Sequence, residues 1–327
     1  MRVAVTGSIA TDHLMTFRGR FADSLVVDQL DKISVSFLAE SLEIRRGGVA
    51  PNICFAMAAL GQRPLLVGAA GQDFGDYRSW LTRHGVDCTH VHISEERHTA
   101  RFVCTTDDDM AQMATFYAGA MSDARNIELG PVAGEEGLDL VLIGANDPDA
   151  MLRHTEECRD RGYTFVADPS QQLAFAEGPF IRQLIDGADY LFTNEYESHL
   201  TEQKTGWDAE EVGRRVTTRV ITQGKDGALV MAKGQDPVHV PVAGDVERVD
   251  PTGVGDAFRG GFLSGLAAGL TSQRCAEIGS VVAAHVLETV GTQEYVLGRA
   301  AFLDRLARAY GDDAAADVAE HLTFGHP

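Results

Sequence analysis

The sequence predicts an α/β protein in which helices cover both faces of a mostly parallel sheet. Short apolar runs of strand length recur along the 327-residue chain, and helix-compatible segments lie between them. A polar or glycine-rich turn follows each apolar run. Strands that alternate with helices are joined by crossovers, which make neighbouring strands parallel and place helices on the two faces of the sheet.

The apolar runs predict six buried strands, and punctuation by glycine and proline predicts three helices. The strands are expected over residues 3–6, 65–67, 138–143, 163–167, 190–192 and 220–222. The helices are expected over residues 51–60, 74–84 and 148–161. Proline opens the first and third of these helices and glycine follows all three, which is the usual asymmetry of helix ends.

A further helix is expected from Ala257 onward. Large apolar residues recur there every fourth position beside a stripe of small ones: Val254, Phe258, Phe262 and Leu266 beside Ala257, Gly261 and Gly265. A helix with a small-residue stripe can lie very close to a sheet. Such packing would hold its N-terminus rigidly at the strand ends, where open α/β sheets bind ligands.

Two segments break the alternation of strands and helices, residues 33–44 and 99–117. Polar and β-branched or aromatic residues alternate there, which predicts antiparallel strands. In the second segment, residues 101–106 and 114–117 flank an acidic turn that begins at Asp107, as in a hairpin with a longer loop. We expect a small projecting sheet, over about residues 13–46 and 98–120, that acts as a lid and excludes water. An ordinary edge hairpin is the alternative.

Composition limits the classes of partner. No linker or internal repeat divides the chain, so residues 1–327 are expected to form one domain with the lid as an appendage. The formal charge of -20 disfavours binding to nucleic acid and to anionic membranes. The five cysteines stand singly and are expected to be buried free thiols. The start lacks the features of a signal peptide and no apolar stretch is long enough to span a membrane, so a cytoplasmic location is expected.

The most informative motif is the run Asp-Pro-Thr-Gly-Val-Gly-Asp at residues 250–256. Its glycines leave backbone amides bare at a helix start, where the helix dipole favours an anion such as phosphate. Asp256 adds a carboxylate that can accept the proton of an attacking hydroxyl. The motif therefore indicates phosphoryl transfer. The alternative is that Asp256 is only a helix N-cap.

Three segments together resemble one family. Residues 7–12, 46–52 and 250–256 stand in the order found in the ribokinase-like (PfkB-type) carbohydrate and nucleoside kinases, and the resemblance covers nearly the whole chain. Residues 168–172 and 102–121 make it most similar to the bacterial adenosine kinases. The resemblance implies a three-layer α/β/α ribokinase-like fold, with a mostly parallel central sheet and a small β-sheet lid.

The resemblance implies the following ligands for the substrate. Asp12, Gly48 and Asn52 would hold the ribose hydroxyls, with Ser8 nearby, and Ser36 is placed among the substrate-binding residues of the lid. A carboxylate can accept two hydroxyl protons, and glycine lets the main chain approach the sugar. Without the family motifs, Asp12 could equally be a turn residue and Asn52 an early-helix amide.

Three aromatic or amide side chains complete the implied nucleoside site. Phe102 and Phe116 would stack on adenine, and Gln172 would read a ring nitrogen. Packing within the lid is the alternative for both phenylalanines. Dimeric members of the family pair their lids, so a homodimer through a lid surface with Phe37 is also expected.

The resemblance also assigns the chemistry. Asp256 would be the general base, and the amides of Gly253, Val254 and Gly255 would form the anion hole for a phosphoryl group transferred in line from ATP. The family more often has alanine where Val254 stands, which matters little if only the amide takes part.

Nucleotide and metal ligands are implied by further positions. Thr222, Gly224 and Gly227 resemble the nucleotide-binding turn, and Asn194 with Glu197 would place Mg²⁺ through water. A capping box is the competing explanation for Asn194 and Glu197. Asp250 and Thr252 match a region that can carry a monovalent cation such as K⁺, although a local turn explains them equally well.

The sequence thus predicts an ATP- and Mg²⁺-dependent adenosine kinase that makes AMP and ADP in purine salvage. No P-loop or protein-kinase motif competes with the 250–256 turn as the phosphate site. A ribokinase- or fructokinase-like sugar kinase is the alternative within the same class. A non-catalytic nucleoside-binding regulatory protein is the alternative of another class, and a Rossmann dehydrogenase is a weak third because the glycine spacing differs.

Overall fold

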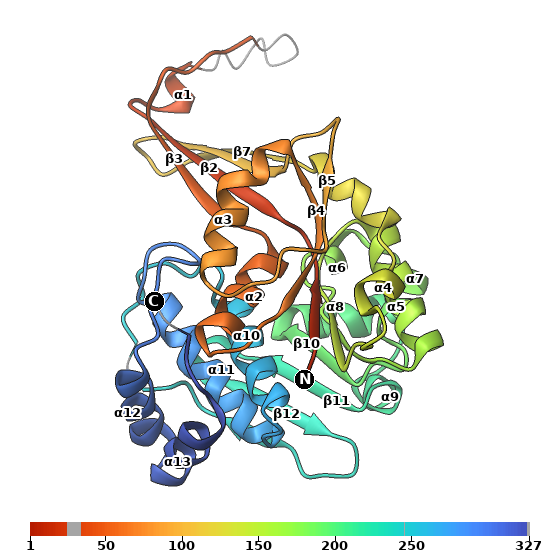
Figure 1. The fold of residues 1–327 in the computed structure, drawn as a ribbon. Coiled ribbons are helices and arrows are strands. Elements are labelled where there is room, and N and C mark those ends of the chain that lie inside the picture. Colours follow the sequence, from red (N-terminus) through yellow and green to blue (C-terminus); the bar gives the residue numbers. More distant parts are fainter. Residues whose placement is uncertain (25–33, 245, 326–327) are drawn as a thin grey trace.

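The computed structural model describes residues 1–24, 34–244 and 246–325, which form a body with a lid projecting from it (Figure 1). The described part of the body holds a nine-stranded sheet in the order β13-β12-β11-β10-β9-β8-β1-β4-β5. Only β12 and β13, at one edge, run antiparallel to their neighbours. The strands are β1 (Val3–Thr6), β4 (Leu65–Gly71), β5 (Val91–Ser94), β8 (Leu140–Ile143), β9 (Thr164–Ala167), β10 (Tyr190–Asn194), β11 (Thr218–Thr222), β12 (Ala228–Ala232) and β13 (Val238–Val240).

The lid is a second sheet of four strands in the order β3-β2-β6-β7. Its strands are β2 (Ala10–Phe17), β3 (Ala39–Gly47), β6 (Ala100–Thr106) and β7 (Gln112–Tyr117), and the short helix α1 (Phe21–Ser24) lies at its tip (Figure 1). The predicted hairpin around Asp107 is present as the antiparallel pair β6–β7. β2 follows β1 after a few residues, so the lid grows directly from the carboxyl end of a central strand.

Helices cover both faces of the body sheet. One apolar core joins the strands to α2 (Val49–Ala59), α3 (Gly75–Arg83), α10 (Val254–Ala267) and α11 (Ser272–Leu287). A second core on the opposite face joins them to α4 (Leu129–Ala133), α5 (Pro148–Arg161), α7 (Gly178–Ile185) and α9 (Ala209–Arg215). The remaining helices are α6 (Gln172–Phe175), α8 (Glu195–Thr205), α12 (Arg299–Tyr310) and α13 (Asp312–His321). Across the described part of the chain, no helix combines the length and apolarity needed to cross a bilayer.

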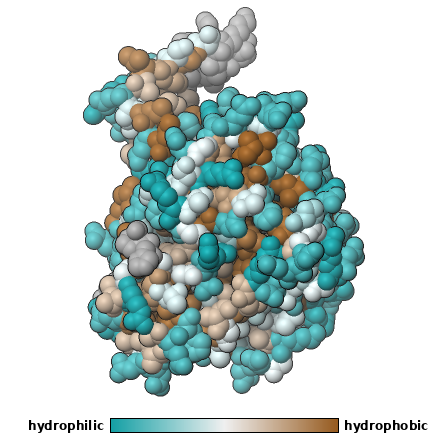
Figure 2. All heavy atoms as spheres, viewed as in Figure 1, coloured by the Kyte–Doolittle hydropathy of each residue, from teal (hydrophilic) through white to brown (hydrophobic). Residues whose placement is uncertain are grey.

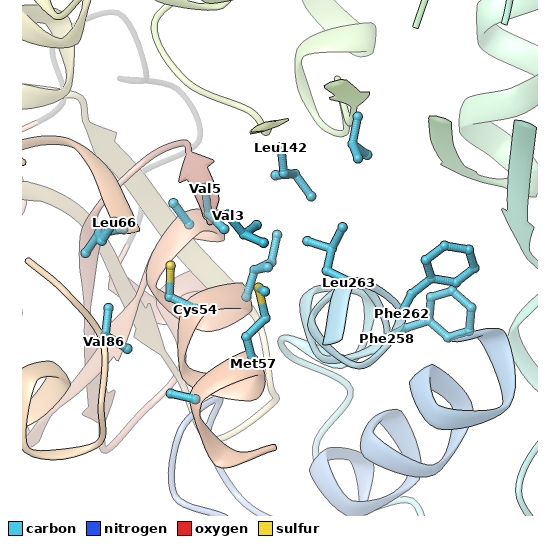
Figure 3. Packing of buried hydrophobic residues seen from close by; sticks show 14 of the residues in the cluster. Val3, Val5, Cys54, Met57, Leu66, Val86, Leu142, Phe258, Phe262 and Leu263 are labelled. Carbon is cyan, nitrogen blue, oxygen red and sulfur yellow. The ribbon is translucent and has the colours of Figure 1, made fainter. Parts of the chain in front are cut away.

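α10 lies at the centre of the first core (Figure 3). Phe258 and Phe262 pack against Phe192 of β10, as the apolar stripe predicted. The small-residue stripe does not face the sheet, contrary to the prediction. A Cβ at Gly261 would lie 2.7 Å from Gly279 Cα, so the stripe permits backbone contact with helix α11. Large residues are needed to fill the wider gap to the strands, and small ones suit the closer helix pair.

Two predicted helices begin at other residues than expected. α10 begins at Val254, three residues earlier than expected, and Gly253 precedes it with φ of 76°. α2 begins at Val49, so Pro51 is its third residue rather than its first. α5 and β1 have the predicted bounds. The predicted strands did not include β2, β5, β12 and β13. β2 is mostly half-buried, and β5 and β13 are short strands at the sheet edges, so these three lack a long apolar run. β12 is an apolar run that the prediction left out.

The expected lid strand over residues 33–44 is also displaced. Residue 33 lies outside the described residues, and residues 34–38 are not in a strand. β3 instead runs from Ala39 to Gly47, because its pairing with β2 matches Phe17 to Ala39 and Ala10 to Gly47. Phe37 packs against Phe17 and Phe21 at the lid tip rather than lying open.

The contact between α10 and α11 predicts a site-specific effect of glycine substitution. Gly261→Ala should lower the free energy of unfolding by about 1–3 kcal/mol, because the new methyl group meets backbone atoms that cannot move independently. Gly213→Ala in α9 is the matched control, since a Cβ there meets nothing within 4 Å and should stabilise the helix by roughly 0.5–1 kcal/mol. Urea unfolding measures both, and equal effects of the two substitutions would contradict the packing.

Candidate active site

The candidate site lies where the carboxyl end of β1 meets the first turns of α2 and α10. Gly48, with φ of 97°, lies against the main chain of residues 8–10: a Cβ there would be 2.5 Å from Ser8 O. Ser8 Oγ accepts a hydrogen bond from the Val49 amide at 3.3 Å. The structure therefore brings Ser8 and Gly48 together, and glycine is required at the second position because both φ and the close contact exclude a side chain.

Asn52 and Asp256 meet across the two helices. Asn52 is buried in α2, and its Nδ2 donates to Asp256 Oδ2 at 2.8 Å. Asp256 is the third residue of α10, so its carboxylate lies beside the free amides of the first turn. The N-cap is Gly253, which makes no side-chain hydrogen bond, so the alternative that Asp256 caps the helix is wrong.

Asp256 is half-buried and lies in an environment of opposing charges. Burial raises its pKa to about 7, while the hydrogen bond from Asn52 and the charge of Arg259 act in the lowering direction. Asp168 and Glu197 add negative charge nearby and raise the pKa further. A carboxyl group that titrates near neutrality is suited to proton transfer at physiological pH.

A buried ion pair lies next to Asp256, in the first turns of α10. Arg259, one turn after Asp256, lies with its Nε 2.5 Å from Asp168 Oδ2, and its Nη2 donates to Asp168 Oδ1 at 2.7 Å. Its Nη1 donates to the Gly255 carbonyl at 3.0 Å, one of the glycines of the motif. Both partners are buried, so loss of either one would leave an uncompensated charge. The arginine thereby fixes the first turn of α10.

The sequence analysis assigned no role to Arg259 or to Asp168. A signal was present in the chain: Arg259 is a single charge in the otherwise apolar or small segment that follows Asp256. A charge that is retained inside an apolar helix needs a buried partner, and Asp168, directly after β9, is that partner.

The lid contributes one face to the site. Asp12 pairs in register with Phe102, and Phe102 pairs with Phe116, so the three side chains lie on the same face of the lid sheet. Asp12 also packs against Gly47, where a Cβ would be 3.2 Å from its Oδ2. Burial raises the pKa of Asp12 to about 6. Phe116 keeps 53% of its surface exposed, so it is not a core residue of the lid.

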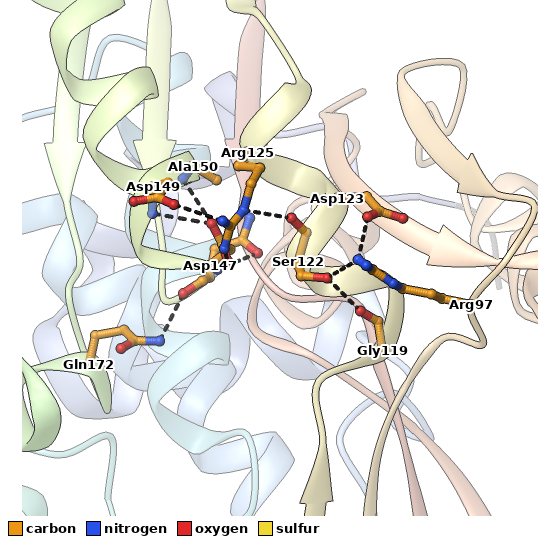
Figure 4. A network of polar contacts seen from close by, with 10 residues as sticks. Arg97, Gly119, Ser122, Asp123, Arg125, Asp147, Asp149, Ala150 and Gln172 are labelled. Atoms are coloured by element: carbon orange, nitrogen blue, oxygen red, sulfur yellow. Dashed lines mark hydrogen bonds and ion pairs between the residues drawn. The ribbon is translucent and has the colours of Figure 1, made fainter.

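Gln172 is the first residue of α6, and its side chain contacts the segment that follows β8. Its Nε2 donates to the Asn146 carbonyl at 2.8 Å, and Ser8 N donates to the neighbouring Ala145 carbonyl at 2.9 Å. Figure 4 shows that the network continues through Asp147 to Arg125 and on to Ser122 in the 3-10 helix Gly119–Asn126. Gln172 can therefore offer a ligand the second hydrogen of Nε2 and the acceptor Oε1.

Asn194 and Glu197 form a capping box at the start of α8, which was the alternative to a metal-binding role for this pair. Asn194 Oδ1 accepts from Glu197 N, and Glu197 Oε2 accepts from Asn194 N, both at 2.8 Å. Burial raises the pKa of Glu197. One Glu197 carboxylate oxygen remains beyond the capping bonds and can accept from a water bound to Mg²⁺, which fits an ion held through water and not one held directly by several carboxylates. The Asn194 amide nitrogen is a donor and suits a phosphate oxygen. Within the described ranges, no cluster of three or more His, Cys, Asp or Glu residues is arranged to bind a metal.

The three residues of the expected nucleotide turn differ in what surrounds them. Thr222 ends β11 directly beside Asn194 of β10. A Cβ at Gly227 would lie 2.1 Å from Val240 O, so packing on β13 already requires this glycine. Gly224 has φ of 56° and open space around it, which leaves room for a ligand.

Asp250 and Thr252 form a local turn, which was the alternative to a site for a monovalent cation. Asp250 Oδ1 accepts from Thr252 N at 2.9 Å, and its Oδ2 accepts from Gly291 N at 3.1 Å. Arg45 of β3 donates to the same carboxylate at 3.2 Å, so the lid is tied to the motif. A monovalent cation at this carboxylate would compete with Arg45. Ser36 is exposed and lies three residues before the start of β3.

The environment of Asp256 predicts an unusual dependence of stability on pH. Its pKa is raised from 3.8 to about 7 on folding, so the native state holds a proton that the unfolded chain has lost between these values. Stability should therefore fall as pH rises from about 4 to 7. Asp256→Asn removes this loss and should raise the free energy of unfolding by about 1–3 kcal/mol at pH 8 and much less at pH 4. Urea titrations at the two pH values measure the free energies of unfolding of the wild type and Asp256→Asn. A difference between the two proteins that is the same at both pH values would contradict the pKa shift.

Comparison with known proteins places this geometry in a family. The model of the pfkB family carbohydrate kinases matches residues 9–297. A nucleoside kinase of Methanocaldococcus jannaschii is 27% identical over 89% of this chain and 92% of its own length. The ligand-free nucleoside kinase of Burkholderia thailandensis is 33% identical over 93% of this chain and 99% of that one, with a TM-score of 0.84. Its structure described as a complex with ADP-inosine gives a TM-score of 0.80 at 33% identity, over 94% and 96% of the two chains. The chain therefore belongs to the pfkB family of carbohydrate kinases and has the ribokinase-like fold.

Proposed function

We propose that this chain is a nucleoside kinase that transfers the γ-phosphoryl group of ATP to the 5′-hydroxyl of adenosine, giving AMP and ADP. The observation that carries the proposal is Asp256: a half-buried carboxylate with a pKa raised to about 7, in the first turn of α10 and hydrogen-bonded to Asn52. The similarity to nucleoside kinases supports a nucleoside as the acceptor.

In the proposed reaction the 5′-oxygen of adenosine attacks the terminal phosphorus of ATP, and Asp256 takes the proton of that 5′-hydroxyl. The bond from that phosphorus to the bridging oxygen breaks in line, and ADP leaves. The amides of Gly253, Val254 and Gly255 stabilise the charge that develops on the transferred group. The Val254 amide makes only a long bond of 3.4 Å to the Pro251 carbonyl, which a stronger anion contact can replace.

The nucleotide and its metal would lie at the ends of β10 and β11. Mg²⁺ bound to ATP would neutralise phosphate charge, and Asn194 with Glu197 would hold it through water. Thr222 and Gly224 would line the nucleotide beside them, as their adjacent positions in the sheet suggest. Thr252 and Asp250 are proposed to bind a monovalent cation only if Arg45 withdraws.

Adenosine is proposed to lie between the body and the lid. Asp12, Gly48 and Asn52 would hold the ribose hydroxyls beside Ser8, while Phe102 and Phe116 stack on the base from the lid face that carries Asp12. Gln172 would read a ring nitrogen of adenine by donating the second hydrogen of its Nε2. Ser36 would approach the substrate only through closure of the lid.

The lid is also proposed to pair with the lid of a second copy. Hydrophobic side chains appear in brown on the projecting part of the surface (Figure 2). Four large apolar side chains that are more than one third exposed lie on the face of the lid sheet opposite to Phe116: Leu42, Ile44, Met113 and Tyr117. Leu38 and Met110 are exposed in the adjoining segments. Such a group on a small sheet is typical of an interaction surface.

Replacing the proposed general base, Asp256, should affect catalysis without affecting the binding of adenosine. Asp256→Asn should lower kcat by roughly 10²–10⁴-fold and leave the affinity for adenosine within a few-fold, because the amide cannot accept the proton. Asp312→Asn, the same change in the first turn of α13, is the control and should keep wild-type activity. A coupled assay of ADP release gives kcat, and calorimetry gives the affinity. Full activity of Asp256→Asn would show that Asp256 is not the base.

The acceptor is tested by the same assay across a panel of adenosine, inosine, cytidine, ribose and fructose. The proposal expects the highest kcat/KM for adenosine. A preference for ribose or fructose would assign a sugar kinase instead, and binding of nucleosides without ADP release would assign a regulatory protein.

Gln172 is expected to contribute to selection of the base. Gln172→Met keeps the length of the side chain but removes the amide donor, so kcat/KM for adenosine should fall by about 10-fold or more while that for ribose changes little. The ratio of the two constants is the measurement. An equal loss for both acceptors would indicate damage to the Asn146 contact instead of base recognition.

A further inference from the structure

A chain of buried hydrogen bonds leads away from Asp256 through Asn52 to the loop after α11. Asn52 Nδ2 donates to Asp256, and its Oδ1 accepts from Gln293 Nε2 at 2.9 Å. The same Nε2 donates to the Tyr77 hydroxyl at 2.6 Å, and that hydroxyl donates to the Gly47 carbonyl at 2.9 Å. The middle members of the chain, Asn52, Gln293 and Tyr77, are all buried.

The direction of each bond in this chain is fixed by its neighbours. Gln293 uses both hydrogens of its amide nitrogen, one toward Asn52 and one toward Tyr77. If the Asn52 amide turned over, its nitrogen would face the nitrogen of Gln293, and its oxygen would face the Asp256 carboxylate. Two donors and two acceptors would then oppose each other in a buried place, where unmet polar groups are costly.

A second observation concerns the other atom of the Gln293 amide. Gln293 Oε1 is buried and has no hydrogen-bond partner among the described residues. The residue therefore contributes donors only, although a buried unpaired carbonyl lowers stability. A side chain kept for stability alone would be expected to satisfy both ends, so the idle oxygen points to a role for the donors.

We propose that Gln293 is a positioning residue: it locks the side-chain amide of Asn52 in the orientation that presents a donor to Asp256. The inference rests on the proposed function, in which Asp256 is the base. Loss of the lock lets Asn52 present its oxygen to the carboxylate, so Asp256 holds its proton to higher pH and fewer molecules have a competent base.

Other groups around Asp256 stay in place when Gln293 is changed. Arg259 of α10, Asp168 after β9, Glu197 of α8 and Tyr295 after α11 all act on the carboxyl group or are acted on by it. Their contributions are common to the wild type and the variants. A shift between the proteins therefore reports the orientation of Asn52.

The test is the pH profile of kcat at saturating adenosine and ATP, from pH 5 to pH 9. Gln293→Met keeps the volume and removes the donors. It should move the acidic limb up by about one pH unit, so that kcat falls about 10-fold at pH 6 and stays within about 3-fold of the wild type at pH 9. Gln293→Glu should move the limb in the same direction, because its carboxylate takes the Asn52 donor.

Tyr77→Phe is the matched control. It removes a buried hydrogen bond from the same chain but leaves the donor from Gln293 to Asn52, so it should lower Tm without moving the acidic limb. The proposal is overturned if Gln293→Met lowers kcat by one factor at every pH, or if Tyr77→Phe moves the limb as far as Gln293→Met does.

A measurement without substrate keeps the inference separate from the proposed function. The difference in unfolding free energy between pH 8 and pH 5 is measured for the wild type, Asp256→Asn, Gln293→Met and the double variant. Gln293→Met should enlarge the loss of stability toward pH 8 only when Asp256 is present. If the wild type phosphorylates no nucleoside, the proposed function fails, and this cycle still decides the inference. An equal effect in both backgrounds refutes it.

Discussion

The site depends on how closely α10 approaches two other helices. A Cβ at Gly260 would lie 2.4 Å from Ala56 Cβ of α2, and one at Gly261 would lie 2.7 Å from Gly279 Cα of α11. Only glycine fits at these adjacent positions, so α10 is clamped between its neighbours with almost no freedom to shift. The same clamp sets the distance between Asn52 and Asp256, since each residue lies about one turn before a contact.

Electrostatics at the first turn of α10 reflects a balance that packing makes possible. The helix start and Arg259 favour a charged Asp256, whereas burial and two nearby carboxylates favour the neutral form. Burial outweighs the groups that favour the charged form, and the pKa rises to about 7. The buried pair of Arg259 and Asp168 is the costly part of this arrangement, and it holds the glycine motif through the Gly255 carbonyl.

An ion pair, a hydrogen bond and close packing connect the lid to the candidate active site. Arg45 of β3 bonds Asp250 at the start of the motif, and Tyr77 bonds the Gly47 carbonyl at the end of β3. Gly47 and Gly48 in turn lie against Asp12 and Ser8. The place where the lid joins the body is therefore also the place where the proposed sugar ligands meet, so movement of one cannot be independent of the other.

The sequence alone determined the alternation of strands and helices, the formal charge of -20, and the motifs around Asp12, Asn52 and Asp256. These properties are local: apolar periodicity, turn residues and helix starts act within a few residues. It predicted neither the contact of the glycine stripe with α11 nor the lid strands β2 and β3 in their true bounds. Only the tertiary structure decided which residues from distant segments meet, namely Arg259 with Asp168 and Gln293 with Asn52. The reason is physical: a lone charge such as Arg259 in an apolar helix indicates locally that a buried partner is needed, but packing decides which residue, 91 or 241 positions away, is the partner.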